Sequence, residues 1–187
     1  METEIKTIFF DLGDTLVCIS HITLAKICKK IGGVRKYPLS IEDYKSAYSN
    51  EWKNRSSLSA LDAVRRTKAN SDESERNYWE SFFESLLTSL NISPCQSELT
   101  DWLINTYMDP SSFVCFNDVH SILSELRSKG WILGIISNAF PSADRMLDHL
   151  ELRQYFKYIF LSFELPYAKP ETRIYQFAAQ KANLPIE

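Results

Sequence analysis

Two hydrophobic patterns alternate along the 187 residues of this chain. Unbroken apolar runs, typical of strands buried on both faces of a parallel sheet, lie at residues 8–10, 131–137 and 158–162. Apolar residues spaced three and four positions apart, typical of amphipathic helices, fill most of the remaining sequence. Strands that alternate with helices predict a doubly wound, Rossmann-like α/β fold built on a parallel sheet.

The alternation is interrupted after the first strand, where helical patterns follow one another without an intervening strand. Gly32-Gly33 predicts the end of the first of these helices, because glycine is common just beyond helix ends. Capping signals at Ser40 and Ser93 predict the starts of two others. The apolar patterns of the predicted helices in this segment lie at residues 22–31, 41–52, 58–64, 79–90 and 94–107, and the acidic run from Ser71 is predicted to be a loop that leads into the first turn of the fourth helix.

These consecutive helices are expected to form a separate all-helical cap over the carboxyl ends of the strands. The predicted cap comprises residues 18–112, and the α/β core comprises residues 1–17 and 113–187. Asp118 is the predicted N-cap of the next helix, and Pro170 is predicted to occupy the first position of the last one. The helices predicted in the second part of the core lie at residues 119–128, 142–150 and 170–182.

The composition argues against a nucleic-acid-binding, membrane-spanning or secreted protein. A net charge of −3 provides no basic excess of the kind that binds nucleic acid. No apolar run approaches the roughly 18 residues of a membrane span. The first residues lack a secretory pattern, so we expect a cytoplasmic protein. The cysteines have no metal-ligand spacing and are expected to be reduced core residues rather than disulfide or zinc ligands; they are Cys18, Cys28, Cys95 and Cys115.

Polar residues that could take part in catalysis or binding follow each of the three predicted strands. Asp11 ends the first strand, Ser137 and Asn138 end the second, and Lys169 lies shortly after the third. Because the carboxyl ends of parallel strands meet at one edge of the sheet, we expect these side chains to converge. An ionised Asp can attack an electrophile to give a covalent intermediate, and a nearby Lys offsets the repulsion between that Asp and an anionic substrate.

With these residues in view, the sequence resembles the haloacid dehalogenase superfamily. The segment IFFDLGDTL is similar to the first motif of that family, GIISN to its second and AKPETRIY to its third. The helical insert resembles the mobile cap that some members carry just after the first motif. Most members of the family are phosphatases that use an Asp nucleophile and Mg²⁺, and a minority are dehalogenases.

The resemblance implies a role for each matching residue. Asp11 would be the nucleophile of a phosphatase acting on a small phosphorylated metabolite, through an aspartyl-phosphate intermediate. Lys169 would be the catalytic charge clamp. Ser137, Asn138 and Thr15 would bind the substrate.

Two features depart from the pattern of the family. Most of its phosphatases carry a second Asp two residues after the nucleophile as general acid/base, and this position is Gly13 here. Asp14, one residue further along, is the alternative acid/base. Mg²⁺ would be held by Asp11 and by the Gly13 main-chain carbonyl. The fourth motif of the family, an acidic pair that adds metal contacts, has no counterpart in this chain.

The first strand also suggests that the sheet continues beyond these three strands. It is apolar like a central strand, yet a sheet of three strands would leave it at an edge, and natural edges are normally blunted or covered. Either the core is incomplete at the C-terminus and a missing segment covers this edge, or a partner such as a second copy of the chain does so.

The departures leave three functions open. The first is the phosphatase. The second is a metal-independent 2-haloacid-type dehalogenase, in which Asp11 attacks carbon; such enzymes also lack the second Asp, so Gly13 is compatible with them. The third is a catalytically weak or inactive relative that binds a ligand or protein through the same fold, which the absent acidic residues favour.

Overall fold

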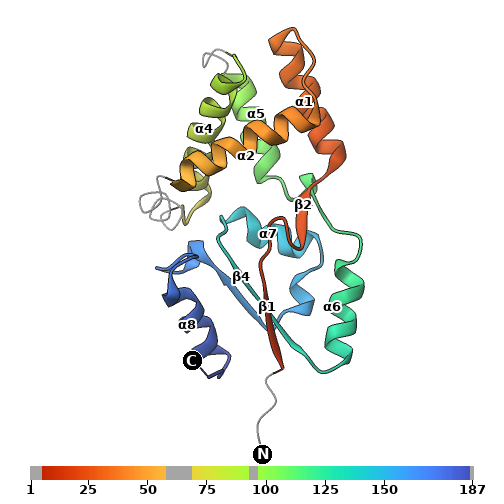
Figure 1. Cartoon of the computed structure of the whole chain (residues 1–187), viewed down its shortest axis with the longest axis vertical. Helices are drawn as coiled ribbons and strands as arrows, with labels where there is room; N and C mark the ends of the chain where they lie inside the picture. Colours follow the sequence, from red (N-terminus) through yellow and green to blue (C-terminus); the bar gives the residue numbers. More distant parts are fainter. Residues whose placement is uncertain (1–5, 58–68, 93–96, 186–187) are drawn as a thin grey trace, which may run out of the picture.

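A parallel sheet lies at the centre of one half of the molecule (Figure 1). The computed structural model describes residues 6–57, 69–92 and 97–185. The parallel strands pair in the order β1-β4-β5, so the predicted α/β fold is confirmed. Their bounds are β1 (Thr7–Phe10), β4 (Ile132–Ser137) and β5 (Tyr158–Leu161).

Helices cover both faces of this sheet, as a doubly wound fold requires. The helices α6 (Val119–Ser128) and α7 (Ser142–His149) pack against the face that carries Leu133. The helix α8 (Thr172–Lys181) packs against the opposite face, where Ile136 lies. Because successive side chains of a strand point to opposite faces, the apolar run of β4 supplies both sides. We call the sheet with α6, α7 and α8 the sheet lobe.

A second group of helices forms the other half of the molecule, above the carboxyl ends of the strands (Figure 1). We call this group the helical lobe, and its members share one hydrophobic cluster. The apolar stripe predicted from the sequence lies on α4, where Phe82, Phe83 and Leu86 are fully buried. The helices are α1 (His21–Arg35), α2 (Ile41–Ser57), α4 (Asp72–Ser89) and α5 (Ser97–Met108).

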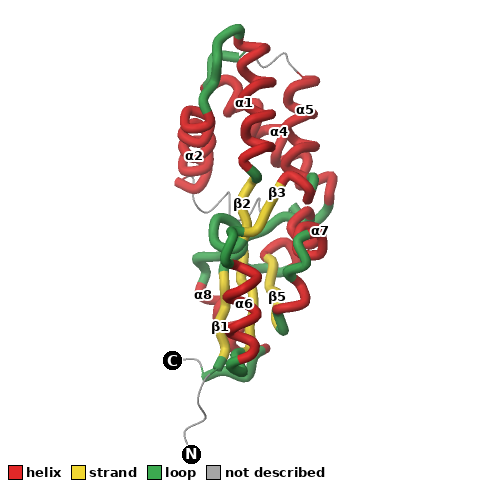
Figure 2. Tube along the Cα trace, turned by 90° about the vertical axis from the view of Figure 1, so that its right-hand side faces the viewer, coloured by secondary structure: helices red, strands yellow, loops and turns green. Residues whose placement is uncertain are grey.

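A short antiparallel ribbon connects the two lobes. The strands β2 (Val17–Ile19) and β3 (Phe113–Cys115) pair with one another and lie between the lobes (Figure 2). No hydrophobic pattern predicts either strand, because runs of three residues are too short to show a periodicity. The remaining short elements are single 3₁₀ turns at Pro110–Ser112, Arg153–Tyr155 and Ser162–Glu164.

The predicted end of α1 at Gly32-Gly33 is wrong, because the helix continues to Arg35. Close packing explains the glycine at position 32. A Cβ there would lie 3.2 Å from the Tyr37 carbonyl oxygen and 3.4 Å from the Leu39 nitrogen. Gly32 therefore lets the returning chain approach the helix, and it does not end the helix.

The two predictions about helix starts in the core have different outcomes. Asp118 occupies the N-cap position of α6, as predicted, although it makes no side-chain cap hydrogen bond among the described residues. The prediction that Pro170 is the first residue of the last helix is wrong, because α8 begins at Thr172. The reason is a turn before the helix, in which the Glu171 N–H donates to the Ala168 carbonyl at 2.8 Å.

The first strand is less buried than predicted. Every residue of β1 is half-buried, although the apolar run suggested burial on both faces. In the described sheet β1 pairs with β4 alone and forms an edge, as expected for a sheet of three strands. The partner or missing segment that would cover this edge stays a prediction.

Some predictions concern residues that the structure does not describe, namely the helix at 58–64, the N-cap at Ser93 and the environment of Cys95. Of the cysteines that are described, Cys28 is buried, Cys18 and Cys115 are half-buried, and all three are free. Among the helices that can be described, none combines the length and the apolar character needed to cross a membrane.

The two neighbouring glycines of α1 provide a test of this packing. Gly33→Ala should raise the free energy of unfolding by about 0.5–1 kcal/mol, because alanine loses less backbone entropy than glycine in a helix. A Cβ at Gly33 would meet nothing within 4 Å. Gly32→Ala should not raise the free energy of unfolding, because overpacking against the Tyr37 and Leu39 main chain typically costs about 1–3 kcal/mol. Urea denaturation followed by circular dichroism measures both, and equal stabilisation would contradict the close contact at Gly32.

Candidate active site

The carboxylate of Asp11 lies at the carboxyl end of β1. Its Oδ1 accepts a hydrogen bond from the Leu12 main-chain N–H at 2.7 Å and pairs with Lys169 Nζ at 2.8 Å. The Asp11 side chain is 44% exposed, so the carboxylate remains open to a ligand. The structure thus brings together the predicted nucleophile and the predicted charge clamp, which are far apart in the sequence.

Asn138 fixes the main chain around Lys169. Its Nδ2 donates to the Lys169 carbonyl and its Oδ1 accepts from the Lys169 N–H, both at 2.7 Å. These reciprocal bonds hold the segment that carries the ammonium group beside Asp11. Asn138 therefore acts on the site through Lys169, whereas its role in binding substrate stays a prediction.

Ser137 is the last residue of β4 and lies next to Leu161 of β5 in the sheet. It is buried, yet it lines the cavity described below. A serine hydroxyl can donate to one ligand oxygen. Its position is compatible with the predicted contact to a phosphoryl group, and that contact stays a prediction.

The loop after Asp11 carries the other predicted site residues. Gly13 has open space beside it, because a Cβ there would meet nothing within 4 Å. Asp14 has a left-handed backbone with φ 56°, and its N–H donates to the Val17 carbonyl at 2.8 Å. Gly13 and Asp14 both line the cavity. Thr15 is exposed on the same loop and is not among the described residues that line the cavity.

A cavity of about 670 Å³ lies between the lobes. This volume is within the range of roughly 300–1,000 Å³ that is typical of small-molecule sites. Its wall from the sheet lobe includes Asp11, Asp14, Ser137, Asn138 and Lys169. Its wall from the helical lobe includes Tyr44, Lys45, Tyr48, Trp52, Trp79 and Tyr107. A ligand in this cavity would meet polar groups on one side and aromatic rings on the other.

Three tyrosines of the helical lobe form part of the cavity wall. The hydroxyls of Tyr44 and Tyr107 hydrogen-bond to one another at 2.9 Å. Burial raises the pKa of Tyr44, Tyr48 and Tyr107 above the ordinary value of tyrosine, and the negative charge of Asp14 adds to the rise at Tyr48 and Tyr107. These rings are therefore neutral at neutral pH.

Lys45 lines the cavity from α2, although no motif in the sequence predicts a role for it. Among the described residues of the cavity wall, Lys45 and Lys169 are the basic ones. Lys169 is paired with Asp11, so Lys45 is the cation of the opposite wall. Its position beside Tyr44 on an exposed helix resembles many surface lysines, and no sequence signal distinguishes it from them.

The carboxylates in the described cavity wall are those of Asp11 and Asp14, and the predicted binding of magnesium by Asp11 and the Gly13 carbonyl stays a prediction. The described residues contain no group of three or more His, Cys, Asp and Glu side chains that could hold a metal by themselves. Mg²⁺ commonly binds through one or two carboxylates together with substrate phosphate oxygens. The exposure of Asp11 fits this shared kind of site.

Comparison with known proteins places these observations in a family. A family model described as haloacid dehalogenase-like hydrolase matches residues 5–187 of the chain. A solved L-2-haloacid dehalogenase from Xanthobacter autotrophicus has the same fold, with a TM-score of 0.64 at 20% identity. The similarity covers 97% of this chain and 66% of that one.

Two curated proteins also match part of the chain. The Pyrimidine 5'-nucleotidase YjjG of Escherichia coli is 31% identical over 106 residues, which cover 55% of this chain and 44% of that protein. The Uncharacterized protein YMR130W of Saccharomyces cerevisiae is 34% identical over 89 residues, which cover 44% of this chain and 30% of that protein. The chain thus spans less than half of the length of either relative.

Proposed function

Because this chain belongs to the haloacid dehalogenase-like hydrolase family, we propose that it is a phosphatase that acts on a small phosphorylated metabolite through an aspartyl-phosphate on Asp11. The observation that carries this proposal is the contact of 2.8 Å between Asp11 Oδ1 and Lys169 Nζ in the wall of the cavity. The curated relative YjjG, named as a nucleotidase, adds support from sequence.

Charge explains why the phosphatase needs this pair. Two like unit charges 4 Å apart repel by about 4 kcal/mol at an effective dielectric constant near 20. A carboxylate that approaches a phosphate monoester would meet this repulsion unless a cation lies beside both groups. The ammonium of Lys169, held by Asn138, supplies that positive charge at the nucleophile.

The proposed reaction has two steps. An oxygen of the Asp11 carboxylate attacks phosphorus in line with the ester oxygen, so a new O–P bond forms while the ester P–O bond breaks. Water then attacks the same phosphorus atom, which releases inorganic phosphate and regenerates the Asp11 carboxylate. Lys169 and Ser137 stabilise the negative charge on the phosphoryl oxygens in both steps. Magnesium bound by Asp11 and the Gly13 carbonyl would neutralise further charge on these oxygens.

The described part of the site lacks an evident general acid for the leaving group. The departing alkoxide needs a proton, and Gly13 has no side chain to supply it. Asp14 is the nearby carboxylate of the loop, but it lies one residue beyond the position of the usual acid, on an exposed left-handed backbone with φ 56°. We therefore propose that Asp14 serves poorly as general acid, so that turnover depends on how easily the leaving group departs without a proton.

The same observation favours a second candidate, a metal-independent 2-haloacid dehalogenase. A halide leaves as a stable anion and needs no proton, so a site with Gly13 in place of an acid suits this reaction. In it, an oxygen of Asp11 attacks the carbon that carries the halogen, and water then hydrolyses the ester at the carbonyl carbon of Asp11. The two candidates share Asp11 and Lys169 and differ in the electrophile.

Substitution of Asp11 tests both candidates. The wild-type chain should hydrolyse p-nitrophenyl phosphate in the presence of Mg²⁺, and Asp11→Asn should reduce the rate by several orders of magnitude because an amide is not a nucleophile. Asp118→Asn, which changes a carboxylate outside the cavity wall, should leave the rate unchanged. Release of halide from a 2-haloacid in the presence of EDTA, without phosphate ester hydrolysis, would replace the phosphatase by the dehalogenase.

A gain of activity tests the account of proton transfer. Gly13→Asp fits the structure, since its side chain would enter open space and the Gly13 backbone is not left-handed. The variant should hydrolyse an alkyl phosphate on the order of 10²-fold faster than wild type, because general acid catalysis typically contributes about 10²–10⁴. Hydrolysis of p-nitrophenyl phosphate, whose leaving group needs little protonation, should change far less.

Gly13→Asn is the matched control for this substitution, because an asparagine side chain has the same size as that of aspartate but cannot act as a general acid. Steady-state rates for the two substrates measure the effect. An equal change for both substrates, or the same gain with Gly13→Asn, would contradict a missing general acid.

A further inference from the structure

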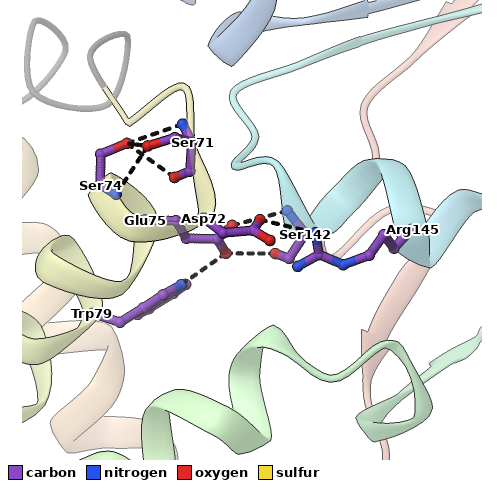
Figure 3. A network of polar contacts seen from close by, with 7 residues as sticks. All are labelled: Ser71, Asp72, Ser74, Glu75, Trp79, Ser142 and Arg145. Carbon is purple, nitrogen blue, oxygen red and sulfur yellow. Dashed lines mark hydrogen bonds and ion pairs between the residues drawn. The ribbon is translucent and has the colours of Figure 1, made fainter.

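Glu75 is a fully buried carboxylate that the proposed reaction does not use. It lies on α4 in the helical lobe, and its partners include the first residue of α7 in the sheet lobe (Figure 3). Its Oε2 accepts from the Ser142 N–H at 2.9 Å, and its Oε1 accepts from the Ser142 hydroxyl at 2.5 Å. The Trp79 indole N–H donates to Oε1 at 3.1 Å.

The contact satisfies a need on each lobe. A buried carboxylate is tolerated only when hydrogen bonds compensate for its lost hydration. At the start of α7 the Ala143 and Asp144 N–H groups donate to the Phe140 and Pro141 carbonyls, whereas the Ser142 N–H donates to Glu75. Pro141, at the N-cap position, has no side-chain acceptor for the Ser142 N–H, and a carboxylate there also meets the positive end of the helix dipole. Glu75 supplies from the helical lobe the cap that α7 lacks in its own sequence.

A second contact joins the helical lobe to the same loop, which connects β4 to α7. Phe140 of this loop belongs to the hydrophobic cluster of the helical lobe. Its ring centroid lies 4.8 Å from that of Tyr78 and 5.2 Å from that of Trp79. The helical lobe therefore holds the loop at Phe140 by packing and at Ser142 by hydrogen bonds.

The loop held in this way also positions the charge clamp. Asn138, four residues before Ser142, makes both hydrogen bonds to the main chain of Lys169. Lys169 in turn pairs with Asp11. A continuous series of contacts thus runs from the helical lobe, through one short loop, to the proposed nucleophile.

We propose that Glu75 is a positioning residue, which couples the seating of the helical lobe on α7 to the placement of Lys169 beside Asp11. Its consequence for catalysis rests on the proposed function, whereas the coupling itself does not. When the helical lobe is seated, Glu75 and Phe140 fix the loop, and Asn138 holds Lys169 in place. When the lobe moves away, the loop loses both supports and Lys169 loses its fixed position.

Amide hydrogen exchange measured by NMR tests the coupling without any substrate. In Glu75→Ala, the Ser142 N–H loses its acceptor directly and should exchange faster. The proposal further expects the Lys169 N–H, which is bonded to Asn138, to exchange about tenfold faster as its loop loosens. Glu75→Gln keeps one oxygen that can accept from Ser142 and should give an intermediate result. If Glu75→Ala does not fold, Ser142→Ala replaces it in this experiment, because it removes only the hydrogen bond from the Ser142 hydroxyl to Glu75.

Asp72→Ala is the matched control, because the ion pair of Asp72 with Arg145 at 2.8 Å joins the same two helices (Figure 3). Both side chains of this pair are exposed, and such pairs contribute little. The Lys169 N–H should exchange within about twofold of wild type in this variant. Faster exchange at Ser142 with unchanged exchange at Lys169 in Glu75→Ala would overturn the proposal.

Kinetics provide the second readout, on any substrate that the wild-type chain turns over. Glu75→Ala should lower kcat by about tenfold to a hundredfold with a smaller change in KM, because misplaced catalytic groups act on the transition state. Glu75→Gln should recover part of the loss. An unchanged kcat in a folded Glu75→Ala variant would also overturn the proposal. Absence of turnover in the wild type would reject the proposed function alone, and hydrogen exchange would still decide the coupling.

Discussion

The contact between Asp11 and Lys169 is the constraint on which the rest of the site depends. A carboxylate can attack an anionic substrate only if a cation offsets their repulsion, so the proposed mechanism requires the ammonium to stay within ion-pair distance of the proposed nucleophile. The parallel sheet brings the two residues to the same edge, and Asn138 fixes the main chain of Lys169 there. The fold thus serves to hold two opposite charges, distant in sequence, at 2.8 Å.

The two lobes divide the remaining work. The sheet lobe supplies polar groups to the cavity, and the helical lobe closes it with aromatic rings and Lys45. The lobes meet at the ribbon of β2 and β3 and again at the loop before α7, where Glu75 caps the helix. A lobe attached at two places can exclude water from the cavity and also affect the loop that positions Lys169.

The sequence predicted what depends on local pattern and strand order. Asp11, Ser137 and Lys169 could be grouped because each follows an apolar run, and parallel strands bring such positions together. The sequence did not reveal contacts that depend on packing between distant segments. Gly32 matched the pattern of a helix end, because its close contact with the chain after the helix is not visible in the sequence. Glu75 matched the pattern of an acidic residue in a first helical turn, which gives no sign of its contact with Ser142. Lys45 had no distinguishing neighbour in sequence, since only the assembled cavity gives it a position near the site.

The role of Asp11 as nucleophile can be tested by trapping the covalent intermediate. The chain would be quenched with acid during turnover of a phosphate monoester, digested, and analysed by peptide mass spectrometry. The account predicts a phosphoryl group on the peptide that contains Asp11, and none on that peptide in Asp11→Asn. Sustained turnover with an unmodified Asp11 peptide, or with the phosphoryl group on another residue, would contradict Asp11 as the nucleophile.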